Sequence, residues 1–148
     1  MGRFMPDALD TVVGIAASGT TPYVIGGLKQ ARDHGLLTAS ICCNPGSPVT
    51  LIADHPIVCV VGPEYLTGST RLKAGTAQKL ILNMISTSAM IRLGRVKGNQ
   101  MVDMALSNQK LIERGVRMIR AASELSEEEA RKLLLEKGSV RKVLEDRF

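Results

Sequence analysis

The sequence contains few aromatic side chains. Its 148 residues include no tryptophan and four other aromatic residues, which are Phe4, Tyr23, Tyr65 and Phe148. Four scattered rings are too few to form the platform on which the bases of a nucleic acid stack. The basic residues are also dispersed, because no block of Lys and Arg is longer than two residues. These two absences make a nucleic-acid-binding module a poorly supported interpretation, and we expect no nucleic-acid partner.

Long apolar runs are absent as well. No run reaches the roughly 18 apolar residues of a membrane-spanning helix, and the best candidate, residues 80–91, is interrupted by an asparagine, a threonine and two serines. Residues 1–7 lack the apolar core of a signal peptide, and Pro6 removes a match to the myristoylation motif. The length, with 45% hydrophobic and 22% charged residues, fits one globular domain. We therefore expect a cytoplasmic protein with no membrane partner.

Cysteine and histidine are too few and too widely spaced to suggest a metal site or a disulfide framework. Cys42 and Cys43 are adjacent and Cys59 stands alone, so the chain has no C-x-x-C pair. Neighbouring residues of a strand point to opposite faces, which disfavours a bridge between Cys42 and Cys43. We expect three packed, free thiols. The two histidines, His34 and His55, are expected at the surface, and no metal is expected.

The net charge of +5 is unevenly distributed along the chain. Residues 1–70 hold 3 Lys and Arg against 5 Asp and Glu, whereas residues 71–148 hold 16 against 9. A basic half of this kind indicates an anionic partner. A small anionic ligand explains the charge as well as a nucleic acid does.

Residues 11–61 alternate between short apolar runs and a helical pattern. Runs that are apolar on both faces predict buried parallel strands. Three runs fit, at residues 11–17, 37–43 and 56–61. A helix is predicted over 22–33, with Thr21 as its cap and Gly35 as its stop, and a short helical turn precedes the third strand. Because strand–helix–strand connections of this length are right-handed crossovers, the sheet is expected to be parallel.

The rest of the sequence is predicted to be helical. Four helices are expected, ending near Gly94, Ala122, Gly138 and Leu144. The second of them is predicted to begin at about Asn99, because apolar residues recur there at helical spacing. Ser126 to Glu129 form a capping box that opens the third helix, and Ser139 is expected to cap the last one.

Three parallel strands make a thin sheet. Doubly wound sheets are wider and bind ligands where the strand order reverses. We therefore interpret the chain as the second half of such a domain. The alternative, a compact three-stranded fold, leaves an apolar strand edge open.

The loop after the first predicted strand has the composition of an anion site. Ser18, Gly19, Thr20 and Thr21 supply three hydroxyls and backbone N–H groups where a helix begins. Gly19 allows the backbone to approach a ligand closely. The alternative interpretation is a helix cap without a ligand.

The loop after the third predicted strand carries a stronger signal. Ser69 and Thr70, together with Thr67 and Thr76, supply hydroxyls, and Arg71 and Lys73 add positive charge within one helical turn. Arginine can hold a phosphate through two parallel hydrogen bonds, and lysine adds a point charge. The alternative is a capped helix with solvated basic residues. Two such loops at one sheet edge favour a phosphorylated small molecule.

Several segments carry a family resemblance. Residues 62–83, from Gly-Pro-Glu-Tyr-Leu-Thr-Gly-Ser-Thr-Arg-Leu-Lys-Ala-Gly-Thr onward, resemble the signature shared by N-acetylmuramic acid 6-phosphate etherases and glucokinase regulatory proteins. Residues 13–24, 43–47 and 98–103 are similar to the etherase pattern, and residues 138–142 resemble a shortened etherase tail. The resemblance covers roughly residues 11–120 and is highly specific.

The resemblance implies a fold, a partner and a site. It implies the sugar isomerase (SIS) α/β fold, a parallel sheet sandwiched by helices, with a partial SIS domain at 1–95 and a helical region at 96–148 that packs on that domain or on a partner subunit. It also implies a homodimer that needs no cofactor and binds a phosphorylated amino sugar. The implied binding residues are Ser18, Gly19, Thr20, Thr21, Ser69, Thr70, Arg71 and Lys73.

The implied reaction is cleavage of the lactyl ether of N-acetylmuramic acid 6-phosphate to N-acetylglucosamine 6-phosphate and D-lactate, by elimination and then hydration, in cell-wall sugar recycling. Acid–base chemistry of this kind needs two positioned carboxyls with different pKa values. In the family these precede the matched region, so we expect no catalytic pair in this chain, with Glu64 as a weak candidate. The alternative function is a non-catalytic sugar-phosphate-binding regulatory module.

Overall fold

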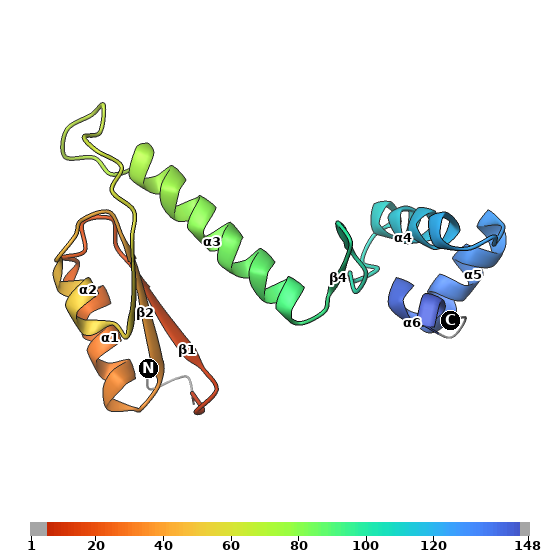
Figure 1. Cartoon of the computed structure of the whole chain (residues 1–148), viewed down its shortest axis with the longest axis horizontal. Helices are drawn as coiled ribbons and strands as arrows, with labels where there is room; N and C mark the ends of the chain where they lie inside the picture. The colour runs from red at the N-terminus through yellow and green to blue at the C-terminus, as the bar shows by residue number, and fades with distance from the viewer. Residues whose placement is uncertain (1–5, 146–148) are drawn as a thin grey trace. The chain divides into compact units, whose positions relative to one another are not determined.

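The structure is a computed structural model that describes residues 6–145, and the chain divides after Ile85 into two compact units (Figure 1). The domain boundary predicted after residue 95 lies beyond this division and stays a prediction. No helix within the described residues is long and apolar enough to cross a membrane.

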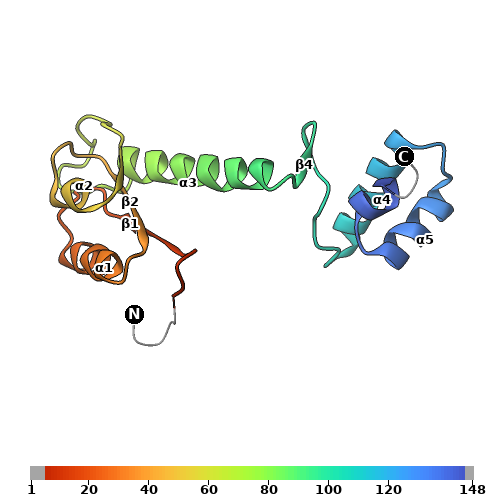
Figure 2. The same ribbon diagram turned by 60° about the horizontal axis from the view of Figure 1, so that its bottom comes forward.

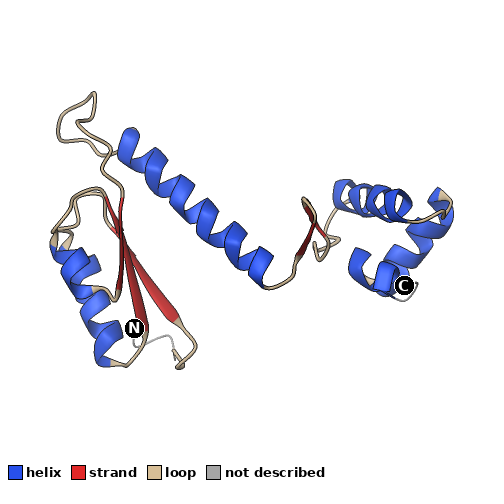
Figure 3. Cartoon of the chain, viewed as in Figure 1, coloured by secondary structure: helices blue, strands red, loops and turns tan. Residues whose placement is uncertain are grey.

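The first unit is built on a three-stranded parallel sheet in the order β1-β2-β3 (Figure 3). The strands are β1 (Thr11–Ile15), β2 (Leu37–Cys42) and β3 (His55–Val58). The register places Ile41 of β2 beside Ile15 and Ile57, one on each side. The predicted parallel α/β arrangement is therefore confirmed.

Helices α1 (Pro22–Asp33) and α2 (Pro48–Ile52) cover one face of this sheet. Leu28 of α1 and Val49 of α2 are fully buried in the small core that they share with Cys42. Gly14 of β1 makes this packing close, because a Cβ atom there would lie 2.7 Å from Leu28 Cδ1. A side chain at Gly14 would thus force the Leu28 and Val24 side chains of α1 to move.

Local sequence explains the limits of α1. Pro22 occupies the first helical position, where the missing N–H costs nothing. Gly35 follows the helix with φ +73°, a conformation that other residues rarely adopt. Thr21 stands at the N-cap as predicted, but its side chain makes no capping hydrogen bond. Its hydroxyl therefore does not have the capping role expected of it.

Helix α3 (Lys73–Arg92) begins in the first unit. Its apolar side chains are not confined to one face. Those within the first unit that remain exposed are Leu80, Leu82, Met84 and Ile85. Val13 and Ile15 of β1 are also more than one-third exposed. The first unit therefore exposes apolar side chains on both α3 and β1.

Besides the end of α3, the second unit contains a short hairpin and three helices, seen from another angle in Figure 2. The hairpin strands are β4 (Val96–Lys97) and β5 (Gln100–Met101), and the helices are α4 (Gln109–Ala122), α5 (Glu127–Lys137) and α6 (Val140–Glu145). The predicted helix over 99–122 was wrong in its first ten or so residues. Gly98 turns the hairpin with φ +61°, and the Asn108 side chain accepts a hydrogen bond from Leu111 N, which starts α4 later.

The helices enclose a separate apolar core. Its fully buried members are Val116, Ile119, Ala130, Leu134, Val140 and Val143. Gly115 permits close packing of α4 on α5, because a Cβ atom there would lie 2.6 Å from Leu134 Cδ2. Leu134 therefore packs directly on the backbone of α4.

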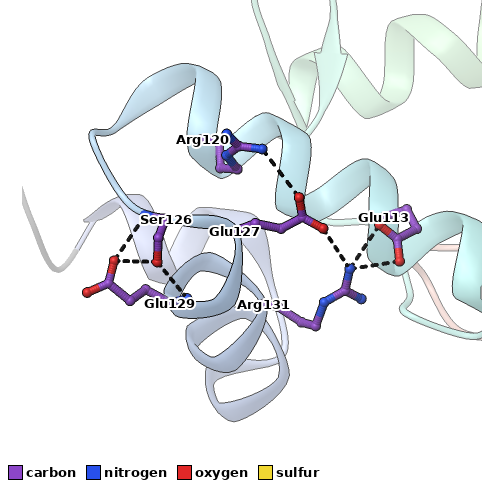
Figure 4. A network of polar contacts seen from close by, with 6 residues as sticks. All are labelled: Glu113, Arg120, Ser126, Glu127, Glu129 and Arg131. Carbon is purple, nitrogen blue, oxygen red and sulfur yellow. Dashed lines mark hydrogen bonds and ion pairs between the residues drawn. The ribbon is translucent and has the colours of Figure 1, made fainter.

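Polar contacts fix α5 to α4 at the surface of this core (Figure 4). The predicted capping box is confirmed, since the Ser126 hydroxyl accepts from Glu129 N and the Glu129 carboxylate accepts from Ser126 N. Arg131 Nη2 lies 2.8 Å from Glu113 Oε1 and 3.3 Å from Glu127 Oε1. The Arg131 guanidinium thus joins one carboxylate on each helix. Gly138 ends α5 with φ +75°, and the Ser139 hydroxyl accepts from Lys142 N, as predicted.

Asp103 ties the end of the hairpin to α6. Its carboxylate accepts two hydrogen bonds from Arg141 Nε, at 3.0 and 2.9 Å, and one from Arg95 Nη1 at 3.3 Å. Arg141 Nη2 also donates to the carbonyl of Gly94. The Arg141 hydrogen bonds hold the pKa of Asp103 below its usual value.

We expect this lowered pKa to make the second unit sensitive to acid. A carboxyl with a lowered folded pKa stabilises fully above its unfolded pKa, about 3.9, and loses that contribution as the pH falls through its folded pKa. The stability advantage of wild type over Asp103→Asn should therefore shrink as the pH falls below about 5. Urea unfolding followed by the NMR signals of α4 to α6 measures it, with the exposed Glu136→Gln as control. An advantage that stays constant down to acid pH would contradict this role.

Candidate functional site

The candidate site lies in the first unit, at the carboxyl ends of the strands. A cavity of about 210 Å³ opens there between the residues that follow each strand and the start of α3. Its lining residues are Ala17, Cys43, Asn44, Val60, Val61, Gly62, Pro63, Glu64, Thr70 and Ala74. Ligands of open parallel sheets bind outside these strand ends. The cavity therefore marks the place that the sequence predicts for a ligand.

The first loop, residues 18–21, follows Ala17, which lines the cavity, and precedes α1. The Ser18 hydroxyl accepts hydrogen bonds from Thr20 N at 3.3 Å and from the Thr20 hydroxyl at 3.0 Å. The carbonyl of Ser18 accepts one from the Asn44 side chain at 3.1 Å. Ser18 is half-buried, whereas Thr20 and Thr21 are exposed. The loop is thus held in shape from within while its two threonines face outward.

Gly19 is required by both its backbone and its neighbour. Its φ is +72°, and a Cβ atom at this position would lie 2.0 Å from Ser47 Oγ. Its carbonyl also accepts a hydrogen bond from Val49 N. The first loop is therefore packed against the start of α2 with no room for a side chain. Gly19 was predicted to let the backbone approach a ligand closely. In the structure, the side chain that its backbone approaches is that of Ser47.

The second loop, residues 62–72, is closed by Glu64. Its two carboxylate oxygens accept hydrogen bonds from Ala74 N and Lys73 N, each at 3.0 Å. These two backbone N–H groups hold the pKa of Glu64 below its usual value. Glu64 therefore occupies the anion position at the N-terminus of α3. This arrangement favours the capping role of Glu64 over catalysis.

The basic residues of this loop have partners of their own. Arg71 Nε donates to the Ser69 hydroxyl at 2.6 Å, and Lys73 Nζ donates to the carbonyl of Pro63 at 2.9 Å. Both cationic side chains are exposed. Because Glu64 already caps α3, a bound phosphate here would rely on the Arg71 guanidinium, the Lys73 ammonium and the nearby hydroxyls. Arg71 keeps two further nitrogen donors for such a ligand.

The structure brings only part of the predicted set into the cavity. Thr70 and the weak candidate Glu64 line it, whereas no residue of the first loop does. The first loop is joined to the cavity lining by the hydrogen bond from Asn44 to the carbonyl of Ser18. Asn44 was absent from the predicted site. Its position directly after a strand, within the Asn-Pro-Gly-Ser segment, is the signal that could have indicated it.

The histidines were predicted to lie at the surface and the cysteines to be free thiols. His34 and His55 are exposed, and Cys42, Cys43 and Cys59 are free thiols, with Cys59 the least buried. Within residues 6–145, no group of three or more His, Cys, Asp or Glu side chains could hold a metal ion.

Comparison with protein-family models gives two matches. The model of the SIS domain matches residues 3–88. The model described as the C-terminal lid domain of glucokinase regulatory protein matches residues 98–145. The first match includes all three strands and both candidate loops, and the second includes the three helices of the second unit.

Comparison with curated proteins gives relatives that share one name, N-acetylmuramic acid 6-phosphate etherase. The relative from Porphyromonas gingivalis (strain ATCC 33277) is 69% identical over 89% of this chain and 48% of its own length. Those from Christiangramia forsetii and Cronobacter sakazakii are 65% and 59% identical over 92% and 86% of this chain. They are matched over 50% and 43% of their own lengths. The chain thus spans about half the length of the curated relatives it matches.

Proposed function

Because the chain belongs to the SIS domain family, we propose that its first unit forms part of a sugar-phosphate site. The proposed phosphate-binding residues are Ser18, Gly19, Thr20, Thr21, Ser69, Thr70, Arg71 and Lys73. The observation that carries the proposal is the cavity at the strand ends, which Thr70 of the second loop lines and whose lining residue Asn44 donates a hydrogen bond to the carbonyl of Ser18 in the first loop. Its volume of about 210 Å³ suits one small polar ligand. The exposed Arg71 beside Ser69 supplies the charge that a phosphate needs.

We further propose that the complete protein cleaves the lactyl ether of N-acetylmuramic acid 6-phosphate, releasing D-lactate. The names of relatives that are 59–69% identical support this substrate. In the proposed reaction, a base removes the proton at carbon 2, an acid protonates the departing lactate oxygen at carbon 3, and water then adds. Both carboxylate oxygens of Glu64 already accept hydrogen bonds from backbone N–H groups of α3. The acid and the base are therefore proposed to come from the part of the relatives' sequence that this chain does not match.

A chimera tests this proposal. In it, this chain replaces the matching half of the Porphyromonas gingivalis relative, and D-lactate is measured with a coupled lactate dehydrogenase assay. Release of D-lactate at a rate near that of the intact relative is expected. A chimera that is folded and binds the sugar phosphate without releasing lactate would contradict the etherase proposal.

That second outcome would support the alternative function, a non-catalytic sugar-phosphate-binding regulatory module. The match of residues 98–145 to the lid domain of glucokinase regulatory protein is the observation that favours this alternative. The same assay therefore separates the two functions.

We also propose that the chain self-associates, with a homodimer as the working form in the cytoplasm, where free thiols stay reduced. The exposed apolar side chains of α3 and of the open face of β1 need to be covered. Light scattering at micromolar concentration is expected to give at least the mass of a dimer. Replacing Leu80 and Met84 with Gln should shift the chain toward monomer, whereas the same change at the exposed Lys79 should not. A stable wild-type monomer would contradict the proposal.

A further inference from the structure

Two of the three cysteines, Cys43 and Cys59, directly follow the paired ends of β2 and β3. Cys42 and Val58 end β2 and β3, and the register pairs them with each other. The pairing continues beyond them, because Cys59 N donates to the carbonyl of Cys42 at 2.9 Å. The next residues along the two strands, Cys43 and Cys59, therefore occupy neighbouring positions. Adjacent parallel strands lie about 4.8 Å apart, within the Cα separation of about 4.4–6.8 Å that disulfides span.

Cys42 differs from this pair although it is next in sequence. Successive side chains of a strand point to opposite faces, and the Ser47 hydroxyl donates to Cys42 Sγ at 3.5 Å on the helix-covered side. Cys42 is fully buried there, in the core that also holds Leu28. Cys42 therefore points to the helix-covered face of the sheet, and the strand alternation places Cys43 and Cys59 on the other face.

The surroundings of the two thiols are unequal. Cys43 is buried and lines the cavity together with Glu64, whereas Cys59 is partly exposed. Burial raises the pKa of Cys43, and the neighbouring Cys59, Cys42 and Glu64 raise it further. Cys59 is therefore the thiol that a reagent from solution reaches first. Cys43 is the thiol that then attacks the mixed disulfide formed on Cys59.

We propose that Cys43 and Cys59 form an oxidisable dithiol that a small-molecule disulfide, such as oxidised glutathione, converts to an intramolecular disulfide in the wall of the cavity. The Cys59 thiolate attacks the reagent, forms a mixed disulfide and expels one glutathione thiolate. The Cys43 thiolate then attacks Cys59 Sγ, which forms the protein disulfide and expels the second glutathione. Two protein thiols are oxidised and one glutathione disulfide is reduced. The two protons lost by the protein thiols pass to the two released glutathione thiolates.

The test uses the full reduced chain under native conditions. After incubation with oxidised glutathione, remaining thiols are alkylated and the chain is cleaved on the amino side of Asp33 and Asp54, which separates Cys59 from the other two cysteines. We expect one alkylated cysteine per chain, and a cross-link between the two peptides with the mass of two hydrogen atoms lost. Because thiolate is the reacting form, the rate should rise as the pH increases above neutrality.

Single variants identify the pair. Cys42→Ser, the matched control, should form the bridge with the yield of wild type. Cys59→Ser should form none, and Cys43→Ser should stop at a mixed disulfide with glutathione on Cys59. Circular dichroism of each reduced variant checks that it is folded. A bridge that involves Cys42, a bridge between two chains, or a wild-type chain that retains glutathione without closing would each overturn the proposal.

Discussion

Leu134→Ala is expected to remove about 2–5 kcal/mol of stability from the second unit, the range for truncating a fully buried leucine. Leu134 is fully buried and packs against α4 at Gly115 as well as against α6. The Arg131–Glu113 ion pair also joins α5 to α4 and opposes their relaxation onto the vacated volume. The loss combines the transfer free energy of the removed methyl groups with the cost of the cavity.

Amide hydrogen exchange in the full chain measures this effect, because the two units need not unfold together. The backbone amides of α4 and α5 should lose protection in Leu134→Ala. Leu135→Ala is the matched control, since that side chain is more than half exposed, and its effect should stay within about 0.5 kcal/mol. Equal loss of protection in both variants would show that Leu134 is not the centre of this core.

Arg71→Ala is expected to weaken binding of a sugar 6-phosphate by about ten-fold or more. A hydrogen bond to a charged group contributes about 1.5–3 kcal/mol, and about 1.4 kcal/mol corresponds to a factor of ten. Glu64 occupies the N-terminus of α3, so positive charge at the second loop comes from the side chains of Arg71 and Lys73. Ser18→Ala removes a neutral hydroxyl and should cost less, about 1 kcal/mol.

Calorimetric titration of these variants should leave binding of the unphosphorylated sugar nearly unchanged. Lys79→Ala is the control for general charge, because Lys79 is an exposed base on α3 outside the loop. A loss in Lys79→Ala equal to that in Arg71→Ala would mean that net charge, and not a phosphate contact, governs affinity. Unchanged binding in Arg71→Ala would remove Arg71 from the site.

The elements that sequence reasoning located correctly are those with local signals. Pro22 and Gly35 define α1 within a few residues of its ends, and Ser126 with Glu129 defines the start of α5. In each case the stabilising contact joins residues close in sequence, so spacing alone reveals it.

The hairpin over 96–101 was missed for the opposite reason. Val102 lies at helical spacing with later apolar residues, but its burial comes from the core of the second unit and not from a helix. Asn108 is the local cap that could have moved the predicted start of α4 to its observed place.

In the candidate site, too, contacts between residues distant in sequence could not be predicted. The loops could be located from Gly, Ser and Thr at strand ends, and the strands themselves from apolar runs. The capping of α3 by Glu64 joins residues nine and ten positions apart across an irregular loop. The contact of Asn44 with Ser18 spans 26 positions. No spacing rule describes such contacts, because they depend on how the loops fold over the sheet edge.

Titration of the full chain with N-acetylglucosamine 6-phosphate and with unphosphorylated N-acetylglucosamine tests the central claim most directly. That claim is that the strand ends of the first unit bind a sugar through its phosphate. Calorimetry should give saturable heat with the phosphorylated sugar at one site per chain, and at least ten-fold weaker binding of the unphosphorylated one. Equal affinity for the two sugars, or no binding of the phosphorylated sugar, would contradict it.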